Sequence, residues 1–189
     1  GIPANYGGYE TFAEKISLIL KKTDEVLVVG DNSNFYVKNE YNGIKTFNSK
    51  YLKAKNPIKF YHDSLKIANS WGADVAIMCG IGGVFSIPLF YFSKMKIFVN
   101  PDGIGYKRNK WAFWKKIALY FQFMFGSFFV KHLVCDSAGI RDFFKAEFKR
   151  SKNIYVAEYG SDLNNLENIK KTDCNAYFKS LNIKKNNYY

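Results

Sequence analysis

The segment at residues 96–103 has the sequence KIFVNPDG, an apolar strand that runs directly into a polar turn. The same pattern occurs at residues 74–80 (DVAIMCG) and 132–137 (HLVCDS). Stretches with apolar residues at helical spacing separate these strands. Strands that alternate with helices predict an α/β fold with a parallel, Rossmann-like doubly wound sheet covered on both faces.

The remaining elements can be placed around this segment. We expect helices over residues 9–22, 60–70, 110–131 and 138–148 and a helical segment from Gly83 to near Phe92, with further strands at 25–29, 44–47 and 153–157. Asn42-Gly43 marks a turn before the second of these strands. The first helix has no strand before it, so we expect that the first strand of the sheet is missing. We interpret residues 1–180 as one domain and 181–189 as a linker or the start of another.

The composition leaves several partners open. The chain has 189 residues, 48% of them hydrophobic, and a formal net charge of +12. Nucleic acid, an anionic membrane and phosphorylated substrates would all be attracted to such a surface, and a coding bias toward lysine is an alternative cause. The three cysteines show no metal-ligand spacing, which favours reduced core thiols.

The longest apolar run, residues 117–130, is shorter than the roughly 20 residues that cross a bilayer. Just before it stand Trp111, Phe113 and Trp114, followed by Lys115 and Lys116. Aromatic and basic side chains together suit the interface of an anionic membrane, and they also suit a core helix with a basic edge. We therefore expect a buried or interfacial helix here, with membrane contact slightly favoured.

Distinctive residues follow four of the predicted strands, at Gly80–Gly83, Asn100–Gly103, Asp136-Ser137 and Tyr159–Asp162. In parallel sheets the ligand lies beyond the carboxyl ends of the strands, so these residues should line one crevice. Asp102 could accept a proton or hold a sugar hydroxyl there, or it could belong to an ordinary Asp-Gly turn.

Glycines and histidines carry weaker signals. Gly7 and Gly8 begin the first helix, where free amides favour an anion, although a tight turn would use the same residues. Residues 80–83 (GIGG) match neither a dinucleotide fingerprint nor a phosphate loop with a following Lys-Ser/Thr. His62 and His132 are the two histidines, so a metal site or a Ser-His-Asp site is poorly supported.

Several motifs together resemble a known family. Residues 1–12 (GIPANYGGYETF), 80–83 (GIGG), 100–104 (NPDGI), 107–111 (KRNKW), 136–140 (DSAGI) and 159–162 (YGSD) follow in the order found in bacterial rhamnosyltransferase-like proteins of glycosyltransferase family 4. The family pattern usually has Glu-Trp after Asp-Gly-Ile. This sequence has Gly105-Tyr106 in its place.

The resemblance implies the N-terminal half of a GT-B enzyme, in which the front domain holds the acceptor and the rear domain holds the nucleotide-sugar. It implies retaining transfer of a sugar, with rhamnose as the candidate, from a dTDP- or UDP-sugar to a lipid-linked saccharide of capsule or lipopolysaccharide. It implies no metal, no cofactor and no nucleic acid, with a cytoplasmic protein at the inner face of the cytoplasmic membrane. We expect residues 1–189 alone to be inactive.

The expected site combines the resemblance with the strand ends. Asp102 is the candidate catalytic residue, and Gly7 and Gly8 resemble the loop beside the donor diphosphate. The expected acceptor-binding residues are Asn100, Gly103, Lys107, Arg108, Gly82, Gly83 and His62, and the expected cleft-lining residues are Ser137, Tyr159 and Gly160. The alternative is a non-catalytic basic α/β module that binds an anionic membrane or nucleic acid.

Overall fold

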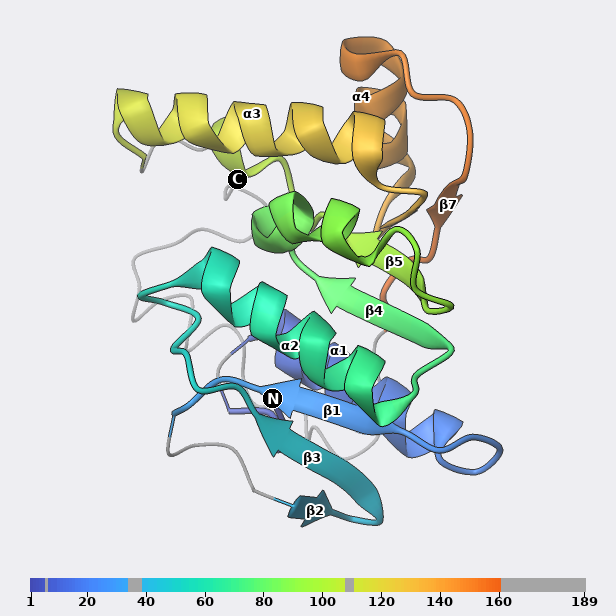
Figure 1. Ribbon diagram of the computed structural model, residues 1–189. Helices are drawn as coiled ribbons and strands as arrows, with labels where there is room; N and C mark the ends of the chain where they lie inside the picture. Colours follow the sequence, from blue (N-terminus) through green and yellow to red (C-terminus); the bar gives the residue numbers. More distant parts are fainter. Residues whose placement is uncertain (6, 34–38, 108–110, 161–189) are drawn as a thin grey trace, which may run out of the picture. The chain divides into compact units, whose positions relative to one another are not determined.

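The computed structural model describes residues 1–5, 7–33, 39–107 and 111–160. The chain divides into two compact units, Gly1–Glu158 and Tyr159–Tyr189. Tyr159 and Gly160 are the described residues of the second unit, and the first unit contains all the described helices and strands (Figure 1).

The larger sheet of the first unit has four parallel strands. They are β4 (Val75–Cys79), β5 (Lys96–Asn100), β6 (His132–Cys135) and β7 (Ile154–Val156), in this order across the sheet. Every neighbouring pair is parallel, and Val99 of β5 lies opposite Met78 on one side and Leu133 on the other. The predicted α/β fold with a parallel sheet is confirmed.

A smaller sheet contains β1 (Leu27–Gly30), β3 (Ile44–Asn48) and β2 (Asn39–Tyr41), with β3 in the middle. β1 pairs parallel with β3, whereas β2 and β3 form an antiparallel hairpin. Asn42 and Gly43 both have positive φ, as a tight hairpin turn requires, so the predicted turn is confirmed. The polar strand β2 was not predicted. Among the described residues, neither β1 nor β4 pairs along its outer edge.

The helices largely follow the predicted pattern. The α-helices are α1 (Gly8–Leu20), α2 (Pro57–Trp71), α3 (Phe113–Phe129) and α4 (Ala138–Phe148). The segment after Gly80 is the 3₁₀ helix η1 (Ile81–Phe90) rather than an α-helix, and Pro88 inside it has no N–H to donate. A second 3₁₀ turn, η2, spans Gly105–Lys107. Ser137 caps α4 by accepting a hydrogen bond from the Ile140 amide at 3.3 Å.

The core lies on one face of the four-stranded sheet. The strands contribute Met78, Ile97, Val99, Leu133 and Cys135, and α2, η1, α3 and α4 cover them with apolar side chains. The rings of Phe123 from α3 and Phe144 from α4 stack with their centroids 5.8 Å apart. This packing fixes the positions from which the carboxyl ends of the strands emerge.

Two cysteines are described, and both are free thiols. Burial raises the pKa of the Cys135 thiol to about 11 and also raises the pKa of Cys79. Both thiols should therefore stay protonated at neutral pH. Since the thiolate is the reactive form, both should react slowly in the folded protein.

We expect iodoacetamide at pH 7.5 to alkylate Cys135 slowly in the folded protein and rapidly in urea, as followed by peptide mass spectrometry. Rapid labelling of folded Cys135 would contradict this burial. Cys174 lies outside the described residues.

Candidate active site at the strand carboxyl ends

A buried asparagine and the turn after it form the centre of the candidate site at the carboxyl ends of the strands. Asn100, the last residue of β5, is 2% exposed, and its side-chain oxygen accepts the backbone N–H of Asp102 at 2.9 Å. Asp102 has φ of 61°, in the left-handed region, and its side chain is exposed. The backbone therefore holds Asp102 in place while its carboxylate stays available to a ligand.

Tyr9 joins the start of α1 to this centre. Its hydroxyl lies 3.1 Å from the Asn100 carbonyl oxygen, to which it donates, and 3.4 Å from the Asn100 side-chain oxygen. The contact brings the N-terminus of α1, with Gly7 and Gly8, to the carboxyl end of β5. Sequence reasoning used the two glycines beside Tyr9 and missed the tyrosine itself.

A second carboxylate, Asp136, follows β6. Its Oδ1 atom is buried and has no hydrogen-bond partner among the described residues. Burial raises the pKa of Asp136, and the negative charge of Asp102 raises it further. Two carboxylates near one another favour neutral hydrogen-bond donors such as hydroxyl groups over a further anion. The sequence predicts Asp136 and Ser137 together at this strand end, and the structure uses Ser137 as a helix cap.

A lysine supplies positive charge close to the same strand ends. Lys53 follows β3, and its backbone N–H donates to the carboxylate of Asp31, just after β1, at 3.0 Å. The Lys53 ammonium lies 5.6 Å from the ring centre of Tyr9 and 5.3 Å from that of Tyr61. The Tyr61 hydroxyl donates to the Cys79 carbonyl, and burial raises the pKa of Tyr61. Lys53 is thus held where it could contact a phosphate.

The glycines after β4 have a packing role. A Cβ atom on Gly83 would lie 2.4 Å from the Cβ of Tyr61, and one on Gly82 would lie 3.1 Å from the Tyr61 ring. Gly80 has φ of 119°, which a side chain rarely adopts. Tyr61 of α2 lies so close to Gly80, Gly82 and Gly83 that a side chain would not fit at these positions, which explains the glycines without a ligand. A Cβ on Gly7 or Gly8, in contrast, would meet no atom of the described residues within 4 Å.

The other predicted site residues lie in varied surroundings. His62 packs against the ring of Phe90, with the centroids 5.8 Å apart, and the Lys107 ammonium lies 4.9 Å from the ring centre of Phe143. Gly103 is partly buried beside Asp102. Arg108 lies outside the described residues, and Tyr159 and Gly160 belong to the second unit.

Gly105 and Tyr106 stand where the family that the sequence resembles usually has Glu-Trp, and the two residues differ in their surroundings. The ring of Tyr106 packs edge-on against Tyr120 and Phe123, so it anchors η2 to the core. A Cβ on Gly105 would meet no atom within 4 Å in the described part of the chain. In the described ranges, no group of three His, Cys, Asp or Glu side chains is arranged to hold a metal ion.

Part of the chain matches a protein-family profile. Residues 77–162 match the profile of a domain of unknown function, DUF1972, which occurs in glycosyltransferase-like proteins. The matched segment contains both Asp102 and Asp136 and most of the four-stranded sheet, whereas Tyr9 and Lys53 lie before it. No curated protein matches the chain.

Proposed function

We propose that this chain is the acceptor-side domain of a retaining glycosyltransferase. In this proposal the protein moves a sugar, with rhamnose as the candidate, from a dTDP- or UDP-sugar to a lipid-linked saccharide for capsule or lipopolysaccharide. The reaction takes place at the inner face of the cytoplasmic membrane, where such an acceptor is embedded.

The observation that carries the proposal is the pair of carboxylates at the strand ends. The carboxylate of Asp102 is exposed, and Asp136 has a buried oxygen without a partner among the described residues. A saccharide presents hydroxyl groups that donate to carboxylates, so both residues suit an acceptor sugar. The matched domain, which occurs in glycosyltransferase-like proteins, supports the same class of chemistry.

Each part of the crevice has a role in this proposal. Asp102 accepts the hydrogen bond, and then the proton, of the acceptor hydroxyl. That hydroxyl attacks the sugar from the face that the diphosphate leaves, so the bond to the diphosphate breaks and configuration is retained. Asp136 orients a second hydroxyl, and Lys53 holds a phosphate of the lipid carrier. The open amides at Gly7 and Gly8 face the diphosphate of the donor. Positioning and electrostatic stabilisation of the leaving diphosphate supply most of the rate enhancement.

Calorimetric titration tests this proposal directly. We expect the protein to bind a saccharide linked to a short-chain prenyl diphosphate more tightly than either the free saccharide or the prenyl diphosphate alone. Asp136→Asn should weaken binding of the linked saccharide about tenfold, because a charged hydrogen-bond acceptor is lost. Asp74→Asn, at the amino end of β4, is the matched control and should bind normally.

The rival function predicts a different result. A basic module for nucleic acid would bind duplex DNA with an affinity that falls steeply with salt and would ignore the saccharide. DNA binding of that kind, together with no binding of the linked saccharide, would replace the proposed function.

A further inference from the structure

An apolar stripe runs along the outward side of α3. Trp114, Phe121 and Phe128 are 78%, 50% and 69% exposed, and they recur at every seventh position. Ala118 and Phe125 stand between them, so the spacing places all five side chains on one side of the helix. The outward side of a surface helix is normally polar, which makes this stripe unusual.

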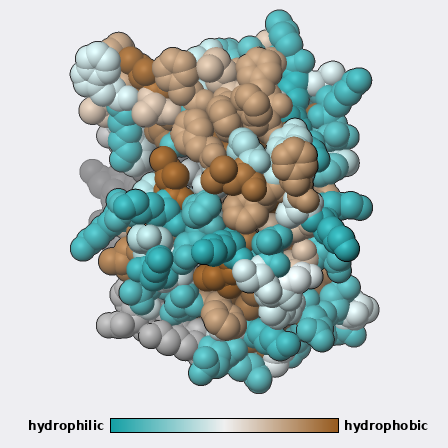
Figure 2. Space-filling view, viewed as in Figure 1, coloured by the Kyte–Doolittle hydropathy of each residue, from teal (hydrophilic) through white to brown (hydrophobic). Residues whose placement is uncertain are grey.

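Exposed apolar residues of η1 lie beside the stripe on α3. The rings of Phe85 from η1 and Phe125 from α3 lie with their centroids 4.9 Å apart. Leu89 and Phe92, in and just after η1, are largely or fully exposed. Figure 2 shows that apolar side chains gather over α3 and η1, in the upper part of the view. We call this surface, made by the exposed apolar residues of α3 and η1, the apolar face. A patch of this extent on one protein indicates a binding partner.

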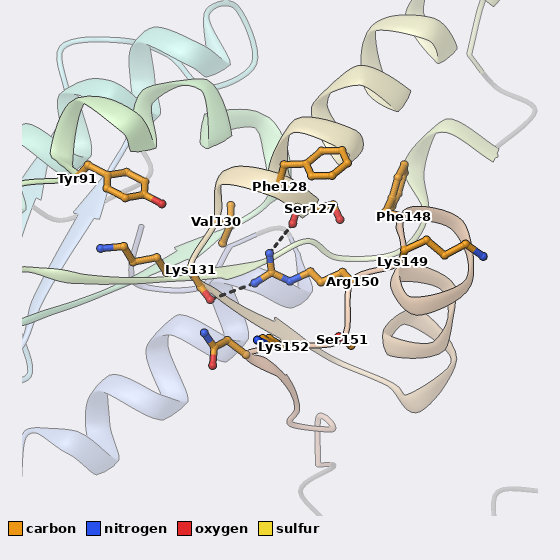
Figure 3. Close-up of a pocket in the computed structure, with 11 residues that line it drawn as sticks. Tyr91, Ser127, Phe128, Val130, Lys131, Phe148, Lys149, Arg150, Ser151 and Lys152 are labelled. Atoms are coloured by element: carbon orange, nitrogen blue, oxygen red, sulfur yellow. Dashed lines mark hydrogen bonds between the residues drawn. The ribbon is translucent and has the colours of Figure 1, made fainter.

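Basic residues border both ends of the apolar face. Lys115 stands over the ring of Trp111 at the start of α3. At the other end, a cavity of about 350 Å³ is lined by Lys131, Lys149, Arg150 and Lys152 together with Phe128 (Figure 3). Among the described residues, no acidic side chain lines this cavity, and its lysines and arginine form no ion pair.

Arg150 is fixed inside this cavity. Its two terminal nitrogens donate to the carbonyl oxygens of Ser127 at 2.6 Å and Lys131 at 3.0 Å (Figure 3). Its Nε and the Ser127 hydroxyl are buried without a hydrogen-bond partner in the described part of the chain. Both residues line the cavity, and unsatisfied buried donors favour an acceptor-rich ligand. A phosphate group offers such acceptors, and the surrounding lysines match its charge.

We propose that the apolar face docks onto an anionic phospholipid bilayer, with a lipid phosphate in the Arg150 cavity. This inference rests on the membrane attachment in the proposed function and names the surface that provides it. Aromatic rings flanked by lysines suit the boundary between head groups and acyl chains. No helix of the described residues is long and apolar enough to cross a membrane, so the contact is interfacial. A second copy of the chain fits less well, because each copy carries a net charge of +12.

Sedimentation with vesicles tests the apolar part of the proposal. We expect the protein to bind vesicles of phosphatidylglycerol and phosphatidylcholine in equal parts, and to bind pure phosphatidylcholine vesicles much more weakly. Phe121→Ser with Phe128→Ser should lower the partition coefficient by about tenfold or more, because both rings lose their burial in the bilayer. Phe47→Ser, a change at another exposed phenylalanine on β3, is the control and should have no effect.

A second pair of variants tests the charged part. Lys131→Gln with Lys152→Gln should weaken binding to the anionic vesicles by about fivefold per removed charge. The control is Lys22→Gln with Lys55→Gln, which lowers the net charge by the same amount. Both lysines are exposed and line neither the cavity nor the apolar face, so this variant should bind the vesicles nearly as the parent does. The proposal is overturned if both pairs of lysine variants lose vesicle affinity equally, or if the protein does not bind the anionic vesicles at all. In the second case, a dimer in solution that Phe121→Ser with Phe128→Ser dissociates would show that the apolar face binds a second copy instead. The assay contains no sugar donor or acceptor, so its outcome is separate from that of the saccharide titration.

Discussion

In a protein that carries this chain together with a donor-binding domain, Asp102→Asn is expected to reduce sugar transfer at least a hundredfold. Loss of a group that accepts the proton of the attacking hydroxyl typically costs a factor of 10² to 10⁴. Asparagine is the informative replacement, because it tolerates the left-handed φ of 61° that residue 102 adopts. The loss would therefore report the missing carboxylate rather than a distorted loop. Transfer of radiolabelled sugar to the lipid-linked acceptor would measure the effect.

The control for this prediction is another exposed aspartate. Asp74 precedes β4, at the amino end of the strands and so away from the candidate site, and its backbone carbonyl accepts the Lys96 amide at 2.8 Å. Asp74→Asn keeps that backbone contact and should leave transfer unchanged. Equal rates in Asp102→Asn and the parent protein would remove Asp102 from the catalytic machinery.

An independent measurement reports whether the two carboxylates interact. The charge of Asp102 contributes to the raised pKa of Asp136. In Asp102→Asn the pKa of Asp136 should therefore fall, although burial should still hold it above the ordinary value. Carboxyl carbon NMR over a pH titration would follow this change without any substrate. A constant pKa would mean that the two groups are too far apart to share a ligand.

The parts of the site that the sequence predicts are those fixed by local structure. Asn100 is the last residue of a strand with a clear apolar pattern, and Asp102 and Ser137 each lie two residues past the end of such a strand. Their place at the carboxyl ends of the strands therefore follows from chain order. The turn at Asn42-Gly43 was likewise predictable because two adjacent residues set its geometry.

Other parts depend on contacts between distant segments. Lys53 is one of 28 lysines and arginines, and what distinguishes it is its proximity to the rings of Tyr9 and Tyr61. Tyr9 lies 91 positions before its partner Asn100, and no local pattern specifies that pairing. The exposed stripe of α3 shows the same limit, because its apolar spacing alone also fits a buried helix.

Gly83→Ala is expected to destabilise the fold by about 3 kcal/mol, at the upper end of the usual range for overpacking. The added methyl group would lie 2.4 Å from Cβ and 2.6 Å from Cγ of Tyr61, and 2.8 Å from the Met78 sulfur. Tyr61 Cβ is attached directly to the backbone of α2, so the helix itself would have to shift. The free energy of unfolding in urea, monitored by circular dichroism, would measure this loss.

Gly105→Ala provides the comparison, because its methyl group would enter open space at a backbone conformation that other residues adopt. The stability of this variant should stay within about 0.5 kcal/mol of the parent.

The two variants, Gly83→Ala and Gly105→Ala, also separate the two interpretations of the glycines after β4. If Gly83 served mainly to let a ligand approach, Gly83→Ala would weaken saccharide binding and leave the unfolding free energy nearly unchanged. If it serves the contact with α2, stability falls first, and the hydrogen bond from the Tyr61 hydroxyl to the Cys79 carbonyl is lost with it. We expect the second result, because the methyl group would collide with atoms of the protein's own core.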